Sequence, residues 1–493
     1  MHGKKHQLSK TLFIRGLQCP KSLYLQKFRP ELKEEVTPEK QRLFDSGSNV
    51  GILAQQLFPG GVNVPYEGLS YTQQIEKTQS LIQQGVDTIY EAAFSYQGVF
   101  VKCDILHLGS DGWAIYEVKS SAKAEEYHFN DVSVQYYVVS GTGLPVAKTF
   151  LVHINKNYVR HGDIEVDKLF AKVDVTDIAM EKRDFIKEEL EKQLNMLDGD
   201  EPVIDIGAHC DNPFSCDFKS HCWSHIPSPS VFDYRGTGKP NSFQLYQKGI
   251  IRLEDVPPDM LGRQTKIQHE GMLYQKNHVN VAALKKFLAS FWYPLCFMDF
   301  ETTFMVPVPM YDGMRPYQQV PFQFSVHVQQ EPDGKLEHYE YLSDGVKNPQ
   351  SEFIDRLLAV IPRDACIVTW NQGFEISRLR EIATAFPDKR DIINHIINNI
   401  RDLMKPFQSM TVYNWQFNGS YSIKAVLPAL VPELSYDDLE INNGGTASSA
   451  WVCMVQTSDS GGKETIRKQL LQYCHLDTLA MVRILEKMKE MAI

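Results

Sequence analysis

The sequence predicts an α/β protein with more than one domain. Its 493 residues exceed what a single hydrophobic core usually organises. Two strand-rich stretches, residues 98–121 and 293–303, lie far apart in the chain, and segments with helical periodicity surround both. Strands combined with helical patterns in this way are typical of α/β units.

The first 225 residues are expected to form one domain. Helical patterns come first, a strand hairpin follows around residues 100–120, and Thr176 is placed to cap the last helix. The helices expected here are 8–28, 71–93 and 177–197.

Residues 226–242 are rich in Pro, Gly and Ser, so they are predicted to form a linker, and a helical connector extends from it to residue 290. Residues 291–493 are expected to form the second domain. Its expected elements are strands at 293–303 and 365–370, helices within 374–400, an exposed loop at 455–465 and a final helix from about residue 464.

Composition indicates a globular protein without a membrane span. Hydrophobic residues make up 43% of the chain and charged residues 23%, both ordinary values. The longest apolar stretch, Phe287–Met298, contains Pro294 and falls short of the ~20 residues that a spanning helix needs. The N-terminus lacks a signal-peptide pattern, and the cysteines show no disulfide framework. We therefore expect a cytoplasmic protein.

The net charge of −10 argues against a general nucleic-acid coat protein. Residues 1–30, however, carry seven Lys or Arg and no Asp or Glu. This basic stretch suits contact with phosphate, and a solvated N-terminus is an equally good interpretation.

Three charged residues are predicted to share one face of the hairpin, whose Ser-Asp-Gly sequence signals a tight turn. With a loop at 110–111, Asp104 lies opposite Glu117, and with a loop at 111–112 it lies opposite Lys119. Side chains alternate along a strand, so either register places all three on the same face. A loop with an odd number of residues would separate them.

Two carboxylates and a lysine on adjacent strands suit a metal-dependent phosphodiesterase. Asp104 and Glu117 would hold Mg²⁺ or Mn²⁺, and the metal would lower the pKa of a bound water. Lys119 would position that water or offset charge on the phosphate. The alternative is a charged, solvated hairpin face, but apolar residues on both sides of the acids favour a central strand.

The spacing Asp-x12-Glu-Val-Lys resembles the signature of PD-(D/E)XK nucleases. By this resemblance, Gln135 matches a glutamine that RecB-like members carry on the following helix, and Glu91 matches an upstream acidic position. Many RecB-like enzymes also place a metal-binding histidine early in the fold, where this chain has Gly51. That difference leaves the metal site one ligand poorer or filled from elsewhere.

Cys210, Cys216 and Cys222 recur at six-residue intervals and form an incomplete ligand set. A subset of RecB-like nucleases, including the AddB type and the CRISPR-associated RecB-like exonucleases, holds a [4Fe–4S] cluster with one cysteine before the nuclease core and three after it. By this resemblance Cys19, which precedes a proline, is the fourth ligand. The family's usual Cys-x2-Cys-x5-Cys spacing differs from the two five-residue gaps here.

Zn²⁺ is an alternative at these cysteines, because thiolates bind both groups and His209 and His221 lie nearby in sequence. Free thiols are the other alternative. The remaining cysteines are predicted to be core residues: Cys103, Cys296, Cys366, Cys453 and Cys474.

A second acidic constellation is spread over residues 291–493. Asp299 and Glu301 are two residues apart on a predicted strand and therefore face the same way. Tyr473 and Asp477 are four residues apart on a predicted helix and share one face. Between these pairs, an Asn-x-x-Phe-Glu segment ends at Glu375.

In this order the four acids resemble the DEDD exonucleases of the DnaQ-like, RNase H-fold group, in the subtype with Tyr-x-x-x-Asp. The resemblance implies two-metal hydrolysis of phosphodiesters. Asp299 would bridge the metals, Glu301 and Asp477 would ligate them, and Tyr473 would orient the water. The family usually has Asp at the position of Glu375, whose longer side chain either reaches a metal through water or marks a weakened site.

The two halves together resemble an uncharacterised bacterial family with this layout. The implied function is a metal-dependent nuclease, exonucleolytic on DNA or, alternatively, RNA, in DNA processing, repair or defence. The rival interpretation is a non-catalytic nucleic-acid-binding scaffold, which Gly51 and Glu375 favour, and a protein with one active domain lies between them. Asp402 is a further acidic candidate, although a residue at a helix N-terminus is an equally good interpretation of it. Residues left without a role are Arg315, Gln319, Gln323 and Lys424.

No ATPase motor is expected. The glycine-containing stretches 141–149 and 236–242 lack the Gly-x4-Gly-Lys-Ser/Thr spacing of a phosphate-binding loop. Any unwinding of a duplex would therefore come from a partner such as a helicase.

Overall fold

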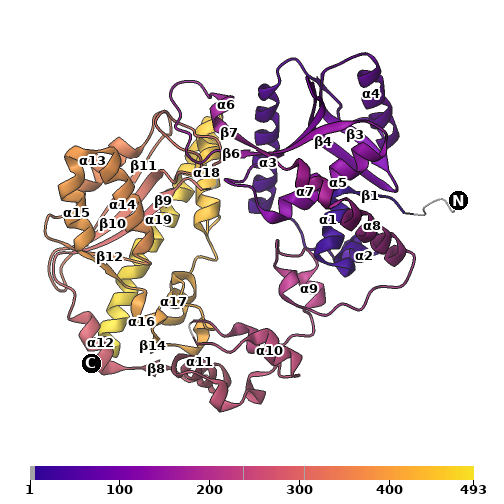
Figure 1. Cartoon of the computed structure of the whole chain (residues 1–493). Coiled ribbons are helices and arrows are strands. Elements are labelled where there is room, and N and C mark those ends of the chain that lie inside the picture. The colour runs from indigo at the N-terminus through magenta and orange to yellow at the C-terminus, as the bar shows by residue number, and fades with distance from the viewer. Residues whose placement is uncertain (1–5, 237, 305) are drawn as a thin grey trace. The chain divides into compact units, whose positions relative to one another are not determined.

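The computed structural model describes residues 6–236, 238–304 and 306–493. The chain forms two compact α/β units (Figure 1), so the predicted α/β class is confirmed. The first unit contains the chain up to His225 and the segment Val306–Tyr317, and the second contains the remainder. Lys4 and Lys5 of the basic N-terminal stretch lie outside the described residues. No helix in the described ranges is both long and apolar enough to cross a membrane.

The first unit is built on a seven-stranded mixed sheet in the order β2-β3-β4-β5-β6-β7, with β1 paired to β4. Its strands are β1 (Leu8–Ser9), β2 (Val62–Asn63), β3 (Thr88–Tyr96), β4 (Val99–Gly109), β5 (Gly112–Lys119), β6 (Val146–Ile154) and β7 (Phe170–Asp174). The strands β3, β4 and β5 form an antiparallel meander, whereas β5 and β6 run parallel and are joined by a crossover helix.

Helices pack on this sheet in two groups. They are α1 (Lys10–Gln18), α2 (Pro20–Phe28), α3 (Pro38–Ala54), α4 (Tyr71–Gln83), the crossover helix α5 (Glu126–Gly141), α6 (Val166–Leu169), α7 (Thr176–Glu181), α8 (Arg183–Leu197) and α9 (Lys219–Cys222). Phe13, Leu81, Val138 and Leu190 bring α1, α4, α5 and α8 into one core. Val50 and Ala54 of α3 belong to a separate core, which also contains Tyr90, Ile105 and Val152 of the sheet.

Three helix predictions in this unit are wrong in extent. The helix expected over 8–28 is divided at Cys19, whose backbone is extended, and its first two residues form β1. The helix expected over 71–93 ends at Gln83, because Gly85 (φ +77°) turns the chain and the β-branched and aromatic residues from Thr88 onward form β3. The helix expected over 177–197 is divided at Lys182, and Thr176 is its first helical residue instead of its cap.

The segment Val306–Tyr317 is part of the first unit. Val308 and Tyr317 pack against the core beneath α3, and the Tyr317 hydroxyl donates to the carbonyl of Ser120. The Arg160 guanidinium donates to the carbonyl of Met310 at 2.8 Å, and the Arg160 backbone is bonded within the same segment. Buried apolar contacts and hydrogen bonds therefore both hold the segment.

The second unit contains a five-stranded sheet in the order β11-β10-β9-β12-β13 and a two-stranded ribbon. Its strands are β8 (His278–Val279), β9 (Leu295–Thr302), β10 (Pro321–Gln329), β11 (Leu336–Leu342), β12 (Cys366–Thr369), β13 (Ile400–Asp402) and β14 (Val412–Tyr413). The central strand β9 is antiparallel to β10 and parallel to β12.

The two faces of this sheet differ in character. The helices are α10 (Ser242–Gln247), α11 (Arg263–Tyr274), α12 (Val281–Leu288), α13 (Gln350–Val360), α14 (Gly373–Ala385), α15 (Arg390–Asn398), α16 (Lys405–Gln408), α17 (Ile423–Leu430), α18 (Gly444–Gln456) and α19 (Ser460–Met491). Cys296, Met298 and Phe300 of β9 join an apolar core with α13, α14 and α15. The alternate residues of β9 therefore point to the other face, on which α19 packs against β9 and β10.

The predicted linker and the predicted loop are both more ordered than expected. Within residues 226–242, Val231 and Tyr234 are buried in a small core with helical neighbours, although the segment is rich in Pro, Gly and Ser. The expected loop at 455–465 is reduced to the residues between α18 and α19, because Asp459 caps the final helix by accepting from the N–H groups of Gly461 and Gly462. Of the five predicted core cysteines, Cys453 is exposed on α18.

Candidate functional site

The hairpin places the charged residues of the first unit as one of the two considered registers requires. Gly109 pairs with Gly112 and Ile105 with Tyr116, so the loop is 110–111 and Asp104 comes next to Glu117 in register. Gly112 adopts a φ of +121°, which favours glycine at this position. One Asp104 carboxylate oxygen also accepts from the N–H of Val118 at 2.6 Å.

Glu117 is the centre of this group, and its side chain is almost fully buried. Its Oε1 lies 2.6 Å from the Lys10 Nζ and 2.8 Å from the Lys119 Nζ, while its Oε2 accepts from the Gln135 amide. The Lys119 ammonium also pairs with Asp131. The structure therefore brings together all four residues predicted for this site.

Electrostatic interactions shift the pKa values of the two carboxyls, Asp104 and Glu117, in opposite directions. Burial, and then the charge of Glu117, raise the pKa of Asp104 to about 8. Burial also opposes the charge on Glu117, but Lys10 and Lys119 outweigh it and lower the pKa of that carboxyl. Lys119 keeps its proton because the charges of Glu117 and Asp131 outweigh burial and raise its pKa.

Lys10 and Asp131 are site residues that the sequence does not reveal. Lys10 reaches Glu117 because β1 pairs in parallel with β4 and Ser9 caps α1 at the next residue. In sequence it is one of several lysines in a basic stretch, and only this long-range pairing identifies it. The lysine supplies positive charge directly to the carboxylate that would bind a cation.

Glu91 and Gly51 are the two further positions that the nuclease resemblance marks near this site, and only Glu91 carries a side chain that could bind a metal. Glu91 sits within β3 at a φ of +56°, beside Asp104 in register, and its carboxylate pairs with Lys102 at 3.1 Å. Such a backbone is strained for a residue with a Cβ and is common at functional sites. Gly51 lies on α3 and offers no side-chain ligand, and an added Cβ there would meet no atom within 4 Å.

The raised pKa of Asp104 predicts how stability depends on pH in the metal-free protein. Asp104 is protonated in the folded chain up to a pH of about 8 but ionises near 3.9 when unfolded. Its stabilising contribution is therefore complete below pH ~4 and is lost as the pH rises toward 8, at up to ~1.4 kcal/mol per pH unit. Asparagine imitates the protonated acid.

Asp104→Asn should therefore gain melting temperature relative to the wild type as the pH rises from 5 to 9 in EDTA. The measurement is thermal unfolding of both proteins at each pH. A constant difference over this range would contradict the raised pKa. Acids remote from Asp104 titrate alike in both proteins and cancel in the comparison, whereas the difference contains the interaction between Asp104 and Glu117.

The four cysteines of the predicted cluster line one pocket in the first unit. Cys19 lies at the junction of α1 and α2, and Cys210, Cys216 and Cys222 lie in the segment that follows α8. Burial raises the pKa of Cys19, and the neighbouring thiols raise it further. His209 also lines the pocket, whereas His221 is exposed and does not.

Polar contacts fix the cysteine segment against the two N-terminal helices. The Gln18 amide donates to the carbonyls of His209 and Phe214 at 2.8 and 2.7 Å, and Asp217 pairs with Arg15 at 2.8 Å. The Cys216 thiol lies 3.5 Å from the hydroxyl of Ser22. Ends of the domain that are remote in sequence therefore meet at this pocket.

The second unit brings three of its predicted acids together. One carboxylate oxygen from each of Asp299, Glu301 and Asp477 lies within 4.8 Å of the other two. Asp299 and Glu301 share the face of β9 that points toward α19, and Asp477 comes from α19. Burial, and then the neighbouring acids, raise the pKa values of Asp299 and Glu301 well above their usual range.

Hydroxyl groups and one lysine complete this acidic centre. The Tyr436 hydroxyl donates to Asp477 at 2.7 Å, and the Tyr473 hydroxyl also helps to hold down the pKa of Asp477, which burial raises to about 6. The Lys424 ammonium lies 5.4 Å from the centre of the Tyr473 ring and interacts with all three acids. Tyr436 and Lys424 are thus site residues, although only Lys424 stands out in sequence.

Glu375 lies outside the 4.8 Å group but near it. It is buried in the first turn of α14, and Asp299 is the charged group that raises its pKa most after burial. In the described part of the chain, its Oε2 is a buried oxygen without a hydrogen-bond partner. Asp402, at the end of β13, accepts from the N–H groups of Asn371 and Met404, so it anchors the loop before α14.

This arrangement fits a divalent cation. Three clustered carboxylates repel one another unless they bind protons or a cation, and the unpartnered Glu375 oxygen offers a further hard ligand. The first unit offers fewer free oxygens, because Lys10, Lys119 and Gln135 already contact Glu117. A cation there would have to compete with ammonium groups.

Comparison with known proteins gives one partial likeness. A family model described as Domain of unknown function (DUF2779) matches residues 296–422. The match begins in β9 and ends just before α17, so it includes Asp299, Glu301 and Glu375 but not Tyr473 or Asp477. No curated protein matches the chain. The likeness carries no activity with it.

Proposed function

We propose that the chain is a metal-dependent nuclease with two phosphodiesterase centres, one in each unit. The observation that carries this proposal is the acidic trio Asp299, Glu301 and Asp477, gathered from β9 and α19 within 4.8 Å. Hard oxygen ligands in this number suit Mg²⁺ or Mn²⁺. Such a cation, when bound, supplies positive charge to a phosphate and acidity to water.

The residues around the trio have distinct tasks in this proposal. Tyr436 holds Asp477 in place through its hydroxyl. The Lys424 ammonium interacts with the phosphate, and the Tyr473 hydroxyl orients the attacking water. Glu375 is the fourth acid. The gathering of these acids with Tyr473 at one centre, and their order in the chain, support a DnaQ-like, RNase H-like fold for the second unit.

For the first unit we propose a RecB-like PD-(D/E)XK fold. Asp104 and Glu117 are the cation ligands, Lys119 neutralises charge on the phosphate, and Gln135 orients Glu117. The central position of the pair in the sheet and the burial of Glu117 support this over the alternative of a solvated hairpin face. DNA ends or single strands are the proposed substrate, with RNA as the alternative.

For the cysteine pocket we propose a [4Fe–4S] cluster, held by Cys19, Cys210, Cys216 and Cys222. Within the described residues, the sulfur atoms form no group of three within 4.8 Å of one another. Four cysteines that line one pocket suit either group, so the resemblance to cluster-holding nucleases makes [4Fe–4S] the proposal and Zn²⁺ the alternative.

Lys119→Ala should lower cleavage by the first unit by ~100-fold or more, because it removes the ammonium that faces the phosphate. The measurement is Mn²⁺-dependent cleavage of labelled single- and double-stranded DNA and RNA in an Asp477→Asn background, in which the second centre is disabled. Lys123→Ala, at an exposed lysine in the following loop, is the matched control and should cleave normally.

Wild-type rates for Lys119→Ala would show that the hairpin acids are a structural ion network. The second candidate function, a nucleic-acid-binding scaffold, is favoured by Gly51 and by the lysines that already neutralise Glu117. It predicts DNA or RNA binding without cleavage by any variant.

A further inference from the structure

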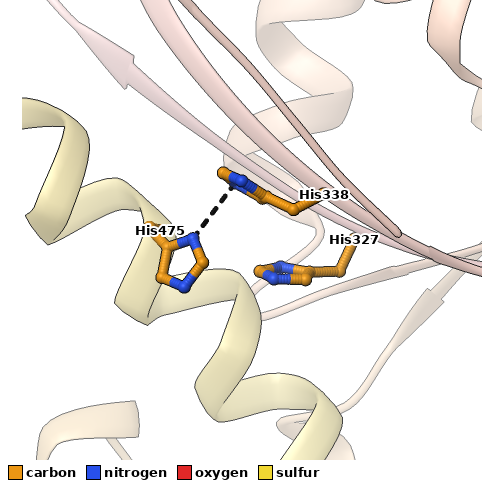
Figure 2. Close-up of side chains that lie close together, drawn as sticks. All are labelled: His327, His338 and His475. Atoms are coloured by element: carbon orange, nitrogen blue, oxygen red, sulfur yellow. Dashed lines mark hydrogen bonds between the residues drawn. The ribbon is translucent and has the colours of Figure 1, made fainter. Parts of the chain in front are cut away.

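Three histidines form a second cluster of ligand atoms in the second unit (Figure 2). His327 comes from β10, His338 from β11 and His475 from α19, and one ring nitrogen of each lies within 4.8 Å of the other two. The trio shares no residue with the acidic trio. His475 is also more than 130 residues from the other two histidines in the chain, so no local sequence motif reveals the cluster.

The fold itself assembles this cluster. His327 and His338 are direct partners across the antiparallel pair β10–β11, so their side chains leave the same face of the sheet. That face is the one on which α19 packs, and His475 approaches from the helix, as Figure 2 shows. The ring centres lie 4.3–4.9 Å apart.

The spacing of the nitrogens suits a common metal ion. The His338 Nε2 and the His475 Nδ1 lie 3.3 Å apart. Two nitrogens bound to a tetrahedral zinc at 2.0–2.1 Å are separated by ~3.3 Å. The same distance allows a hydrogen bond between neutral rings, so the distance alone leaves both possibilities.

Outer contacts orient the rings as they do in metal sites. The Thr478 hydroxyl donates to the carbonyl of His475 at 3.1 Å and lies 2.8 Å from the His327 Nδ1, which directs the other nitrogen of His327 toward the cluster. A hydroxyl partner on the outer nitrogen, such as Thr478 on His327, fixes the tautomer and direction of a ligating imidazole. Ser325 contacts Thr478 at 2.7 Å, and its hydroxyl also lies 3.0 Å from the His338 Nε2, the nitrogen that faces His475. A metal bound at this nitrogen would displace the Ser325 contact.

Burial also disfavours the charged form of two of the three rings. Burial, and then the other histidines, lower the pKa of His327 to about 3, and burial together with His475 lowers that of His338 to about 4. Arg483 is a further positive charge that acts on His327. A neutral imidazole keeps a lone pair with which it can bind a metal.

We propose that His327, His338 and His475 form a binding site for a divalent transition metal, most suitably Zn²⁺, with a water in the fourth position. Imidazole nitrogens favour such metals over Mg²⁺, which prefers oxygen. The site is therefore chemically distinct from the acidic trio, and it does not depend on the proposed nuclease activity.

The proposed metal would fasten a helix to a sheet. His475 lies between Tyr473 and Asp477 on α19, and its two partners lie on β10 and β11. A metal bound by all three would join the helix that carries Asp477 to the sheet that carries Asp299. It would act as a structural clamp that positions the acidic centre.

The test is titration of metal-stripped full-length protein with Co²⁺, which reports its ligands in the visible spectrum. The wild type is expected to bind one equivalent more than His338→Gln, and the difference spectrum of the two proteins should show the intense bands of a low-coordinate, nitrogen-ligated ion without a sulfur charge-transfer band. His338→Gln should lose this equivalent or bind it at least ~100-fold more weakly. His395→Gln, at a histidine on α15 outside the cluster, should bind like the wild type.

Unchanged Co²⁺ stoichiometry and spectrum in His338→Gln would overturn the proposal and leave a hydrogen-bonded cluster of neutral imidazoles. If His338→Gln does not fold, the same Co²⁺ titration is carried out on His475→Gln. X-ray absorption at the zinc edge of the wild type then identifies the atoms that ligate the metal. One equivalent of zinc with about three histidine nitrogens supports the site, and oxygen or sulfur neighbours alone refute it. Because these readouts do not involve cleavage, failure of the metal site and failure of the nuclease proposal are distinguishable.

Discussion

Asp299→Asn is expected to remove cleavage by the second unit, by ~10³-fold or more, while making the metal-free protein more stable. Asp299 is the acid that links the group, because its charge acts on Glu301 and on Glu375. An amide of the same shape cannot replace a carboxylate as a ligand that bridges metals. It also removes one buried, mutually repelling acid, which is worth ~1–3 kcal/mol at pH 8.

Two measurements on the same variant check this prediction. Mn²⁺-dependent cleavage is assayed in a Lys119→Ala background, and thermal unfolding is followed in EDTA. The matched control is Asp388→Asn, at an exposed aspartate that precedes α15. Normal cleavage by Asp299→Asn would make the second unit a binding module, and an unchanged melting temperature would contradict the repulsion among its acids.

Cys216→Ala is expected to have the largest effect on stability. Protein purified without oxygen should be brown, and the variant should lose its colour, its iron and ~10 °C or more from the melting transition of the first unit. The reason is that Cys19 and the segment 210–222 come from opposite ends of the domain, so the ligands close a very long loop. Colour, iron content and thermal unfolding are the three readouts.

Cys453→Ala provides the matched control for this loss. Cys453 is exposed on α18 and belongs to the second unit, so its removal should change none of the three readouts. Colourless wild-type protein with one equivalent of zinc at this pocket would replace the cluster with the zinc alternative. An unaltered Cys216→Ala protein would leave four free thiols.

Local sequence patterns predicted the positions that depend on neighbouring residues. The Ser-Asp-Gly turn left two registers open, and both place Asp104, Glu117 and Lys119 on one face, so only this common face could be predicted before the pairing was known. The two-residue spacing of Asp299 and Glu301 likewise fixed their common face. The error at residues 84–93 was of the opposite kind, because a glycine turn and strand-forming residues outweighed an apparent helical period.

Contacts between distant segments could not be predicted in this way. Lys10 reaches Glu117 only through the parallel pairing of β1 with β4. The histidines on β10 and β11 become neighbours only when the register of those strands is known, and α19 must then pack on the same face. No residue pattern in the segment 306–317 indicates that it belongs to the first unit.

The return of Val306–Tyr317 to the first unit has a genetic consequence. The chain joins the two units at three places, so no single division of the gene yields two complete products. A fragment that ends at His225 would lose the Tyr317 hydroxyl bonded to Ser120 and the apolar cover of the core beneath α3. The complementary fragment would carry that apolar segment without its binding surface. Gene fission or simple domain exchange would therefore damage both halves, and the two units are expected to be inherited together as one polypeptide.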